Sequence, residues 1–309
     1  MREIVQSSDL SIVLAGEAGQ GIQLIESVIT TLSVKAGYHV FATKEYMSRV
    51  RGGVNSTSLR ISSRPVTSFV NRIDILIPLS LQGIRHLTSR MDNHTVIIAD
   101  DSITDEREII HVSFNSIARE IGNQIYSNTV AAGLITALLS IDPAMTEDFI
   151  GSIFDKKGDA IRNNNILAVR RGYDMAKKIA ITVPQIGKGN ESDRITLSGA
   201  DAVALGALAG GCDYVCGYPM SPSTGVLERM AKYSLSHDII VEQVEDEIGV
   251  VNMALGAWYA GGRALVTTSG GGFALMCEGI SLAGMIETPL VIHLAQRPGP
   301  ATGLPTRTE

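Results

Sequence analysis

The strongest constraint on the fold comes from the last third of the chain, where short apolar runs alternate regularly with longer helical segments. The predicted elements are, in order, helix 199–209, strand 214–216, helix 223–233, strand 239–244, helix 247–259, strand 264–268, helix 273–286 and strand 290–295. Strands that alternate with helices form a parallel sheet with helices on both faces, because each connection has to cross over the sheet. The sequence therefore predicts a parallel-sheet α/β domain over residues 196–309.

The first half of the chain predicts a second α/β domain. A strand at 11–15 leads into a glycine-rich loop, and the helix that follows at 22–36 ends at Gly37, a typical helix-terminating glycine. Further strands are predicted at 38–42, 56–61, 73–78, 95–99 and 109–114, and helices at 130–139 and 148–179. We expect a Rossmann-like domain over residues 1–183, joined to the next domain by a turn-rich linker at 184–195.

Composition excludes several classes of function. The net charge of −6 and the absence of a basic run argue against nonspecific nucleic-acid binding, which needs clustered lysine and arginine. The first ten residues contain no apolar signal-peptide core, and no stretch reaches the roughly 18 apolar residues needed to span a membrane. We therefore expect a cytoplasmic protein with neither nucleic acid nor membrane as a partner.

The three cysteines, Cys212, Cys216 and Cys277, are too few and too irregularly spaced for a disulfide framework, a zinc site or an iron–sulfur site. We interpret them as buried apolar residues. The chain is therefore predicted to hold no metal, and any cluster that its chemistry requires must lie on another chain.

The loop after the first predicted strand carries Gly16, Gly19 and Gly21, and its glycines would let the backbone approach an anionic ligand at a helix N-terminus. The dinucleotide-binding fingerprint has glycines at its first, third and sixth positions, whereas this loop has them at the first, fourth and sixth. No acidic residue that could bind the ribose hydroxyl groups follows the second strand, so the pattern does not favour NAD. A tight turn without a ligand is the alternative.

A second candidate is the segment 44–54, in which Arg49 and Arg51 precede two glycines. Its guanidinium groups would bind phosphate or carboxylate, and the alternative is a surface hairpin or a subunit contact.

The other candidates follow predicted strands of the second domain, where open α/β sheets bind their ligands. They are Tyr218, Pro219 and Ser221 in the loop 217–224, the acidic cluster 242–247 ending at Glu247, Ser269 and Gly270 in a glycine loop, and Arg297. Ser221 is also a candidate N-cap, with Pro222 in the first turn of the helix. Carboxylates at a helix start are often surface charge that complements the helix dipole, and each signal alone is weak.

Four of these motifs occur in the order found in one known family. GYPMSPST (217–224), VEQVEDEIGVVNMALGA (241–257), TTSGGGFALM (267–276) and ETPLVIHLAQRPGPATGLPTRTE (287–309) together resemble the α subunit of 2-oxoacid:ferredoxin oxidoreductases. GEAGQGI (16–22), YMSRVRGG (46–53) and NTVAAG (128–133) resemble the γ domain of the same enzymes. The chain is thus similar to a fused γ–α arrangement, of the type that acts on 2-oxoglutarate.

The resemblance implies roles for several residues. In the family the α subunit holds the pyrimidine ring of thiamine diphosphate, and a β subunit holds the diphosphate, Mg²⁺ and a [4Fe-4S] cluster. Glu247 matches the glutamate that bonds the aminopyrimidine, Arg297 the arginine that takes the substrate carboxylate, and Ser221 the position near the substrate oxo group. Tyr218, Pro219, Ser269 and Gly270 complete the expected cofactor contacts.

The implied reaction is decarboxylation of a 2-oxoacid on the cofactor ylide, electron transfer through the cluster to ferredoxin, and acyl transfer to coenzyme A. The γ domain is a candidate for coenzyme A handling through Gly16, Gly19, Gly21 and Arg51. Ala18 stands where many γ subunits carry glycine, which weakens any nucleotide-binding role for the loop. Family members usually continue beyond the strand that precedes Arg297. We therefore expect this chain to be part of a longer subunit of a hetero-oligomer.

Two other readings stay open. An indolepyruvate-type or branched-chain relative would use the same chemistry on another side chain. A non-catalytic assembly or regulatory subunit with a Rossmann-like binding domain would not depend on thiamine diphosphate.

Overall fold

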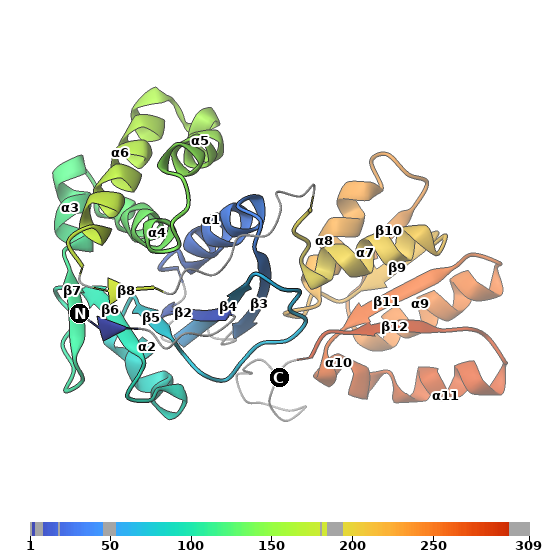
Figure 1. Cartoon of the computed structure of the whole chain (residues 1–309). Helices are drawn as coiled ribbons and strands as arrows, with labels where there is room; N and C mark the ends of the chain where they lie inside the picture. The colour runs from blue at the N-terminus through green and yellow to red at the C-terminus, as the bar shows by residue number, and fades with distance from the viewer. Residues whose placement is uncertain are drawn as a thin grey trace. The chain divides into compact units, whose positions relative to one another are not determined.

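The computed structural model describes residues 2–3, 9–17, 19–45, 54–179, 181–183 and 194–296. They form two compact units, one extending to Thr196 and one beginning at Leu197 (Figure 1). Each unit is an α/β structure built on its own sheet. A short parallel pairing of β1 (Arg2–Glu3) with β8 (Ile181–Thr182) brings the two ends of the first unit together.

The first unit contains a six-stranded mixed sheet in the order β3-β4-β2-β5-β6-β7. Its strands are β2 (Asp9–Glu17), β3 (His39–Glu45), β4 (Val54–Ser62), β5 (Ile75–Pro78), β6 (Val96–Asp100) and β7 (Ile109–Val112). Strands β2, β5, β6 and β7 are parallel, whereas β4 runs antiparallel to both of its neighbours. The antiparallel β3–β4 pair adds a mixed edge to the predicted Rossmann-like arrangement.

Most helices of the first unit cover one face of this sheet, and one short helix lies on the other (Figure 1). The covered face carries α1 (Ile22–Lys35), α3 (Phe114–Ile121), α4 (Ser127–Leu138), α5 (Pro143–Phe154) and α6 (Asp159–Ala176). Helix α2 (Leu81–His86) packs on the opposite face with β2, β5 and β6.

The predicted helix at 148–179 is divided in two by the structure. Helix α5 begins with Asp142 as its N-cap, whose side chain accepts a hydrogen bond from the backbone amide of Ala144 at 2.7 Å. It ends before Gly158, whose φ of +94° is strained for other residues. Glycine therefore separates α5 from α6, a break that the apolar spacing did not predict.

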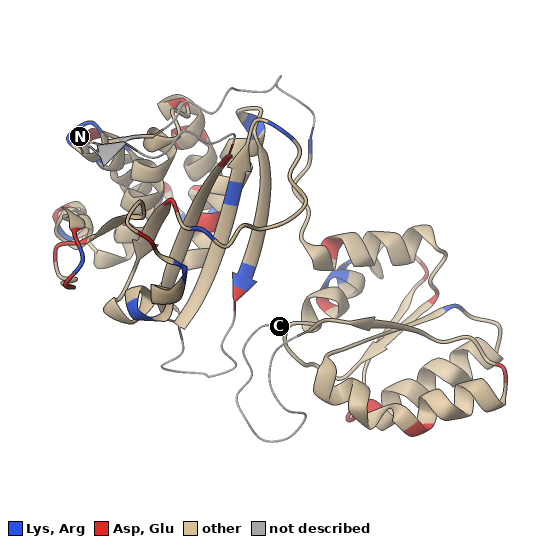
Figure 2. Cartoon of the chain, turned by 60° about the horizontal axis from the view of Figure 1, so that its bottom comes forward, with Lys and Arg blue, Asp and Glu red and all other residues tan. Residues whose placement is uncertain are grey.

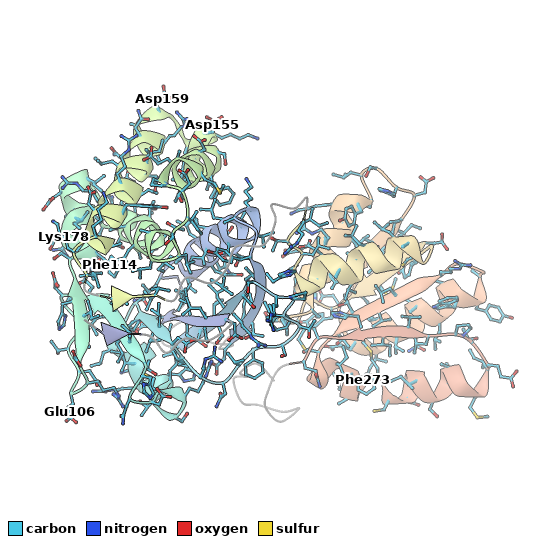
Figure 3. The ribbon with its side chains drawn as sticks, viewed as in Figure 1. Glu106, Phe114, Asp155, Asp159, Lys178 and Phe273 are labelled. Carbon is cyan, nitrogen blue, oxygen red and sulfur yellow. The ribbon has the colours of Figure 1, made fainter. Side chains whose placement is uncertain are left out.

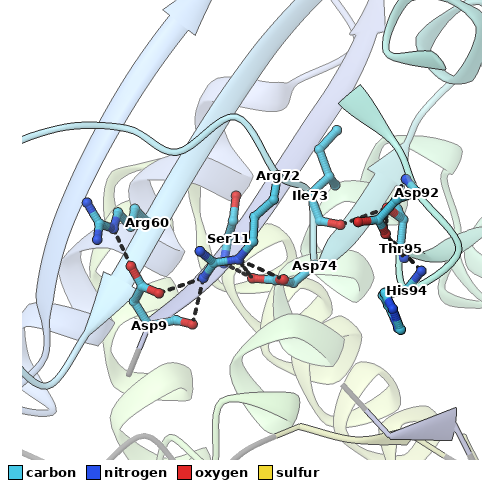
Figure 4. Close-up of polar contacts among 9 residues, drawn as sticks. All are labelled: Asp9, Ser11, Arg60, Arg72, Ile73, Asp74, Asp92, His94 and Thr95. Carbon is cyan, nitrogen blue, oxygen red and sulfur yellow. Dashed lines mark hydrogen bonds and ion pairs between the residues drawn. The ribbon is translucent and has the colours of Figure 1, made fainter. Parts of the chain in front are cut away.

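A network of charged side chains around the buried Asp9 ties three strands of the first sheet together near the start of β2 (Figure 4). Asp9, which is 6% exposed, accepts hydrogen bonds from the guanidinium groups of Arg60 on β4 and Arg72 before β5. Arg72 also bonds Asp74 at 3.1 Å, and Asp74 accepts from the amide of Ser11 at 2.7 Å. Burial raises the pKa of Asp9, but the hydrogen bonds from Arg72 and Arg60 outweigh it and hold the pKa below its usual range.

The second unit contains a four-stranded parallel sheet in the order β10-β9-β11-β12. The strands are β9 (Tyr214–Gly217), β10 (Ile240–Gln243), β11 (Ala264–Thr268) and β12 (Val291–Leu294). Helices α7 (Gly199–Ala209) and α8 (Thr224–Tyr233) pack on one face, and α9 (Glu247–Tyr259), α10 (Gly270–Leu275) and α11 (Cys277–Met285) on the other (Figure 1). This confirms the predicted parallel α/β fold with helices on both faces.

Side chains alternate between the two faces along the central strands. Val215 and Leu265 pack under α7 and α8, while Cys216 and Val266 pack under α9. Burial raises the pKa of the Cys216 thiol to about 12, so this cysteine behaves as a core residue.

Two predicted helix boundaries of this unit change in the structure. Helix α8 begins at Thr224, so Ser221 is not its N-cap; Ser223 precedes the helix, and its hydroxyl bonds the carbonyl of Met220 at 2.6 Å instead. The predicted helix 273–286 is two helices, because α10 begins earlier at Gly270 and ends before Met276.

Candidate functional site

The candidate site of the second unit lies at the carboxyl ends of its parallel strands. Strands β9 and β11 are neighbours, yet the helix after β9 packs on one face and the helix after β11 on the other. The chain therefore leaves the carboxyl ends of these two neighbouring strands toward opposite faces of the sheet, and such a position is the usual place of ligand binding in open α/β sheets. Residues 217–223 connect β9 with α8, and residues 268–272 run from the end of β11 into α10.

Glu247 is the first residue of α9 and is only 4% exposed. Its neighbour Asp246 caps the helix by accepting a hydrogen bond from the amide of Gly249 at 2.6 Å, whereas the Oε1 atom of Glu247 is buried with no hydrogen-bond partner. A buried carboxylate oxygen without a partner is costly, and native proteins rarely keep one unless a ligand or water bonds it. Of the acidic cluster, this carboxyl group is therefore the one suited to a ligand.

The turn after β11 packs directly on that carboxyl group. A Cβ atom added at Gly272 would lie 2.7 Å from the Oε1 atom of Glu247, and also closer than 3.0 Å to the hydroxyl of Thr268. Glycine at this position therefore allows the turn to close over Glu247. Ser269, in the same turn, is fully buried, and its hydroxyl also lacks a hydrogen-bond partner.

The loop after β9 carries the other predicted residues and begins close to β11. Gly217 lies close to β11, because a Cβ there would be 3.0 Å from the carbonyl oxygen of Thr267. Tyr218 is 37% exposed, Pro219 is half-buried and Ser221 is exposed. Glu247 contacts, at Gly272, the turn that also contains Ser269 and Gly270.

Arg297 and Arg51 both lie outside the described residues. The chain reaches Gln296 directly after β12, so the predicted arginine follows the strand that neighbours β11.

Apolar side chains surround the turn after β11 on the outside. Phe273 on α10 is 38% exposed (Figure 3), and Leu275 and Ile248 are more than half exposed. In Figure 2 the ribbon of α9, α10 and α11 is mostly in the tan of uncharged residues. A carboxyl group under such a surface has little competition from water, which strengthens any hydrogen bond that it makes.

The glycine loop of the first unit is closed by its own side chains. The side-chain oxygen of Gln20 accepts a hydrogen bond from the amide of Glu17 at 2.7 Å and lies 2.5 Å from the place of a Cβ at Gly16. Gly19 and Gly21 have φ angles of +90° and +79°, which favour glycine. At Gly21 a Cβ would also collide with the amide group of Asn128 on α4.

A cavity of about 280 Å³ opens beside this loop, at the carboxyl ends of β2, β5 and β6. Neutral amide groups and apolar groups predominate in its lining, which includes Gln20, Leu79, Asn115, Gln124 and Asn128. Its one carboxylate, Asp100, accepts hydrogen bonds from Ser102 and from the amide of Asn115 at 2.8 Å. The lining suits a neutral ligand group with amides better than a phosphate, since none of the described residues that line it is a lysine or an arginine.

Helices α4 and α6 hold one wall of this cavity rigid. A Cβ at Gly133 would lie 2.5 Å from the carbonyl oxygen of Val169, and Gly172 packs equally closely on α4. The hydroxyl of Thr129 also donates to the side-chain oxygen of Asn165 at 2.7 Å, and both residues are buried.

Within the described parts of the chain, no group of histidine, cysteine, aspartate or glutamate side chains is arranged to hold a metal ion. Cys216 is buried and Cys212 half-buried, but Cys277 is exposed at the start of α11, so its predicted burial was wrong. The helical spacing there faces the cysteine outward. None of the described helices has the length and apolar character needed to cross a membrane.

Sequence reasoning missed the neighbours that shape the site. From the motif 267–276 the sequence predicts only Ser269 and Gly270 as site residues. The same motif contains Gly272, Thr268 and Thr267. The run of three glycines signalled a close approach of the backbone but not the group that approaches it.

Two family models match the chain and together cover both units. The model of pyruvate ferredoxin/flavodoxin oxidoreductases matches residues 11–175, more than half of the chain. The chain belongs to this family. The model of its thiamine diphosphate-binding domain matches residues 205–309, which include Glu247. The resemblance inferred from the motifs is thereby confirmed.

Similar proteins carry both domains in one polypeptide. The α subunit of a 2-oxoacid:ferredoxin oxidoreductase from a Sulfolobus species is 31% identical over 97% of this chain and 56% of its own length. The 2-oxoglutarate oxidoreductase subunit KorA of Mycobacterium tuberculosis is 26% identical over 96% of this chain and 52% of its own. The chain thus spans about half the length of these relatives.

A solved structure is similar over nearly the whole chain. It is the 2-oxoglutarate:ferredoxin oxidoreductase of Magnetococcus marinus with 2-oxoglutarate, coenzyme A and succinyl-CoA bound. The TM-score is 0.87 at 29% identity, over 97% of this chain and 54% of the other.

Proposed function

We propose that the chain is part of a subunit of a 2-oxoacid:ferredoxin oxidoreductase that performs thiamine diphosphate-dependent oxidative decarboxylation, with 2-oxoglutarate as the substrate. The observation that carries the proposal is the Oε1 atom of Glu247, which is buried without a partner in a domain of the thiamine diphosphate-binding type. The relatives named for 2-oxoacids and 2-oxoglutarate support the substrate class.

The buried polar groups of Glu247 and Ser269 fit an aminopyrimidine ring. Glu247 would bond the ring through its unpartnered oxygen and exchange a proton there, and Ser269 offers a second buried group that needs a partner. Tyr218, Pro219 and Gly270 would enclose the ring. When bound, thiamine diphosphate supplies the carbanion that adds to a 2-oxo carbon and takes up the electrons left by decarboxylation.

The substrate contacts rest on the motifs. Ser221 would donate its hydroxyl to the oxo group, and Arg297 would bind the carboxylate through two parallel hydrogen bonds. Ser221 is exposed in the loop after β9.

We also propose that the first unit handles coenzyme A through Gly16, Gly19, Gly21 and Arg51. The amide-lined cavity beside the glycine loop supports a neutral portion of that molecule as its ligand. The solved relative contains coenzyme A and succinyl-CoA.

The other cofactor groups of the reaction would be bound by a partner subunit. We propose that a β subunit holds the diphosphate, Mg²⁺ and a [4Fe-4S] cluster, and that ferredoxin accepts the electrons. The hetero-oligomeric state and the cytoplasmic location stay predictions, as do the indolepyruvate-type and branched-chain alternatives.

The test is 2-oxoacid-dependent reduction of a viologen dye by the subunit assembled with its β partner, in the presence of coenzyme A and thiamine diphosphate. We expect Glu247→Gln to lower the rate by about 1,000-fold, because the amide cannot exchange a proton with the cofactor ring. Glu245→Gln is the matched control, since Glu245 is an exposed carboxylate of the same cluster. Comparison of pyruvate with 2-oxoglutarate then identifies the substrate.

A different result identifies the rival function. If Glu247→Gln leaves dye reduction unchanged, the catalytic role of this carboxyl group is wrong. If the wild-type assembly binds no thiamine diphosphate in a calorimetric titration, the chain is a non-catalytic assembly or regulatory subunit.

A further inference from the structure

We propose that His293 is a positioning residue, which holds the loop 217–223 at the carboxyl edge of the second sheet through the hydroxyl group of Thr267. This inference rests on the proposed function, because that loop carries Tyr218, Pro219 and Ser221.

Four hydrogen bonds lead from the edge strand β12 into the loop. The Nδ1 atom of His293 lies 3.0 Å from the Oγ1 atom of Thr267, its neighbour in register on β11. The same Oγ1 atom lies 3.3 Å from the carbonyl oxygen of Ser223. Ser223 in turn donates to the carbonyl of Met220 through both its amide, at 2.9 Å, and its hydroxyl, at 2.6 Å.

These hydrogen bonds form a relay from His293 through Thr267 to Ser223. The relay is buried at its centre and reaches both ends of the loop. Thr267 and Ser223 are each 1% exposed, so water does not compete for their hydrogen bonds. At the other end of the loop, Gly217 packs on the backbone and methyl group of Thr267, where a Cβ would lie 3.0 and 3.1 Å away. Thr267 therefore contacts the loop where it begins and where it ends.

The hydrogen bonds assign the proton on the histidine ring. A carbonyl oxygen only accepts, so the single hydroxyl proton of Thr267 points to Ser223. The Nδ1 atom of His293 must then donate to Thr267, which leaves Nε2 as the unprotonated nitrogen of the neutral ring. Burial lowers the pKa of His293, which favours this neutral form.

The geometry also selects the variants that test the relay. Thr267→Val removes the hydroxyl and keeps the branched shape. His293→Asn keeps an N–H donor near the position of Nδ1, whereas the longer His293→Gln places its amide near that of Nε2. The asparagine and glutamine variants are thus a matched pair that differs in the position of the donor.

The first measurement is hydrogen exchange of the backbone amides in 217–223, by mass spectrometry on the full 309-residue chain. We expect about tenfold faster exchange in Thr267→Val and in His293→Gln, and a change of less than about threefold in His293→Asn. The fluorescence of the single tryptophan, Trp258, verifies that the second unit is folded in each variant.

The second measurement is the ¹⁵N spectrum of the imidazole ring, which reports its tautomer directly. A proton on Nε2 in the neutral ring would overturn the proposal, as would unchanged loop exchange in Thr267→Val. In the assembled enzyme we expect His293→Gln to raise KM for the 2-oxoacid about tenfold and to change kcat less, because a displaced loop weakens substrate binding. We expect His293→Asn to have the KM of the wild type.

The two proposals fail in different ways. Normal dye reduction by the wild type together with unchanged loop exchange in Thr267→Val would refute the relay and leave the enzyme function standing. Faster loop exchange in the variants, with no thiamine diphosphate binding by the wild type, would refute the function and support the relay.

Discussion

The two units treat their buried carboxylates in opposite ways. Among the described residues, three carboxylates are almost fully buried: Asp9 and Asp100 in the first unit and Glu247 in the second. Asp9 is bonded by two arginines, and Asp100 by a hydroxyl group and backbone amides. The Oε1 atom of Glu247 has no partner.

The difference separates a structural role from a binding role. A buried carboxylate with a full set of donors stabilises the fold and offers nothing more to a ligand. A buried oxygen without a donor costs free energy in the isolated chain, and a ligand that donates to it recovers that cost. The contrast can be tested by disturbing each carboxylate through its neighbours.

The largest effect is expected from crowding Glu247. In Gly272→Ala the new methyl group would displace both Glu247 and Thr268, and we expect dye reduction by the assembled enzyme to fall about 100-fold. Gly284→Ala is the control, because a Cβ at Gly284 meets no atom within 4 Å and should leave the rate unchanged. A wild-type rate in Gly272→Ala would mean that this turn does not position the carboxyl group.

The second largest effect, on the stability of the first unit, is expected from removing a hydrogen-bond donor of Asp9. Arg72→Met removes the guanidinium that bonds both Asp9 and Asp74, and we expect the free energy of unfolding of the first unit to fall by about 2 kcal/mol. Urea unfolding followed by far-ultraviolet circular dichroism measures this loss.

Arg170→Met provides the matched comparison for the Asp9 network. Arg170 pairs with Glu147 on the surface, where its side chain is 61% exposed, and such pairs contribute less than about 1 kcal/mol. Equal losses in the two variants would show that burial adds nothing to the Asp9 network. The fluorescence of Trp258, which lies in the second unit, should be unchanged in both.

Acid should weaken the first unit through the same network. The pKa of Asp9 is lower in the folded state than in the unfolded chain, so its contribution is complete above the unfolded value of about 4 and is lost as pH falls through the folded value. We expect the urea midpoint of the first unit to decrease below about pH 5, and less steeply in Asp9→Asn. Identical slopes for the two proteins would place the acid sensitivity elsewhere.

The smallest effect is expected at the helix that carries Glu247. Asp246→Ala removes the N-cap that bonds the amide of Gly249, and we expect a loss of about 1 kcal/mol in the unfolding of the second unit, followed by Trp258 fluorescence. The control is Glu245→Ala, since Glu245 is exposed and precedes the cap. A loss of equal size in the control would assign the effect to charge and not to capping.

Much of the second unit could be predicted because its signals are local. The predicted helices 199–209 and 247–259 and the strand 264–268 have the bounds of α7, α9 and β11. Helix α7 begins with a capping box in which Ser198 and Asp201 bond each other's backbone, a signal that lies within four residues. Hydrophobic periodicity and turn residues act over similarly short distances.

Local sequence patterns predicted the wrong helix boundaries where tertiary contacts determined which of two similar positions begins or ends a helix. Ser221 and Ser223 are equally suited to cap a helix, and the contacts of Ser223 with Met220 and Thr267 decided that α8 begins after the second serine. Apolar spacing continued through Gly158 and Met276, where the structure ends one helix and begins another.

The α/β class, the order of strands and helices, and the motifs that carry the family resemblance follow from the amino-acid sequence, because each depends on neighbouring residues. The position of β9 between β10 and β11, the antiparallel direction of β4, and the burial of Glu247 against the turn at Gly272 became known only from the folded chain. Those features arise from strand pairing and side-chain packing between residues far apart in the chain, which no local pattern specifies.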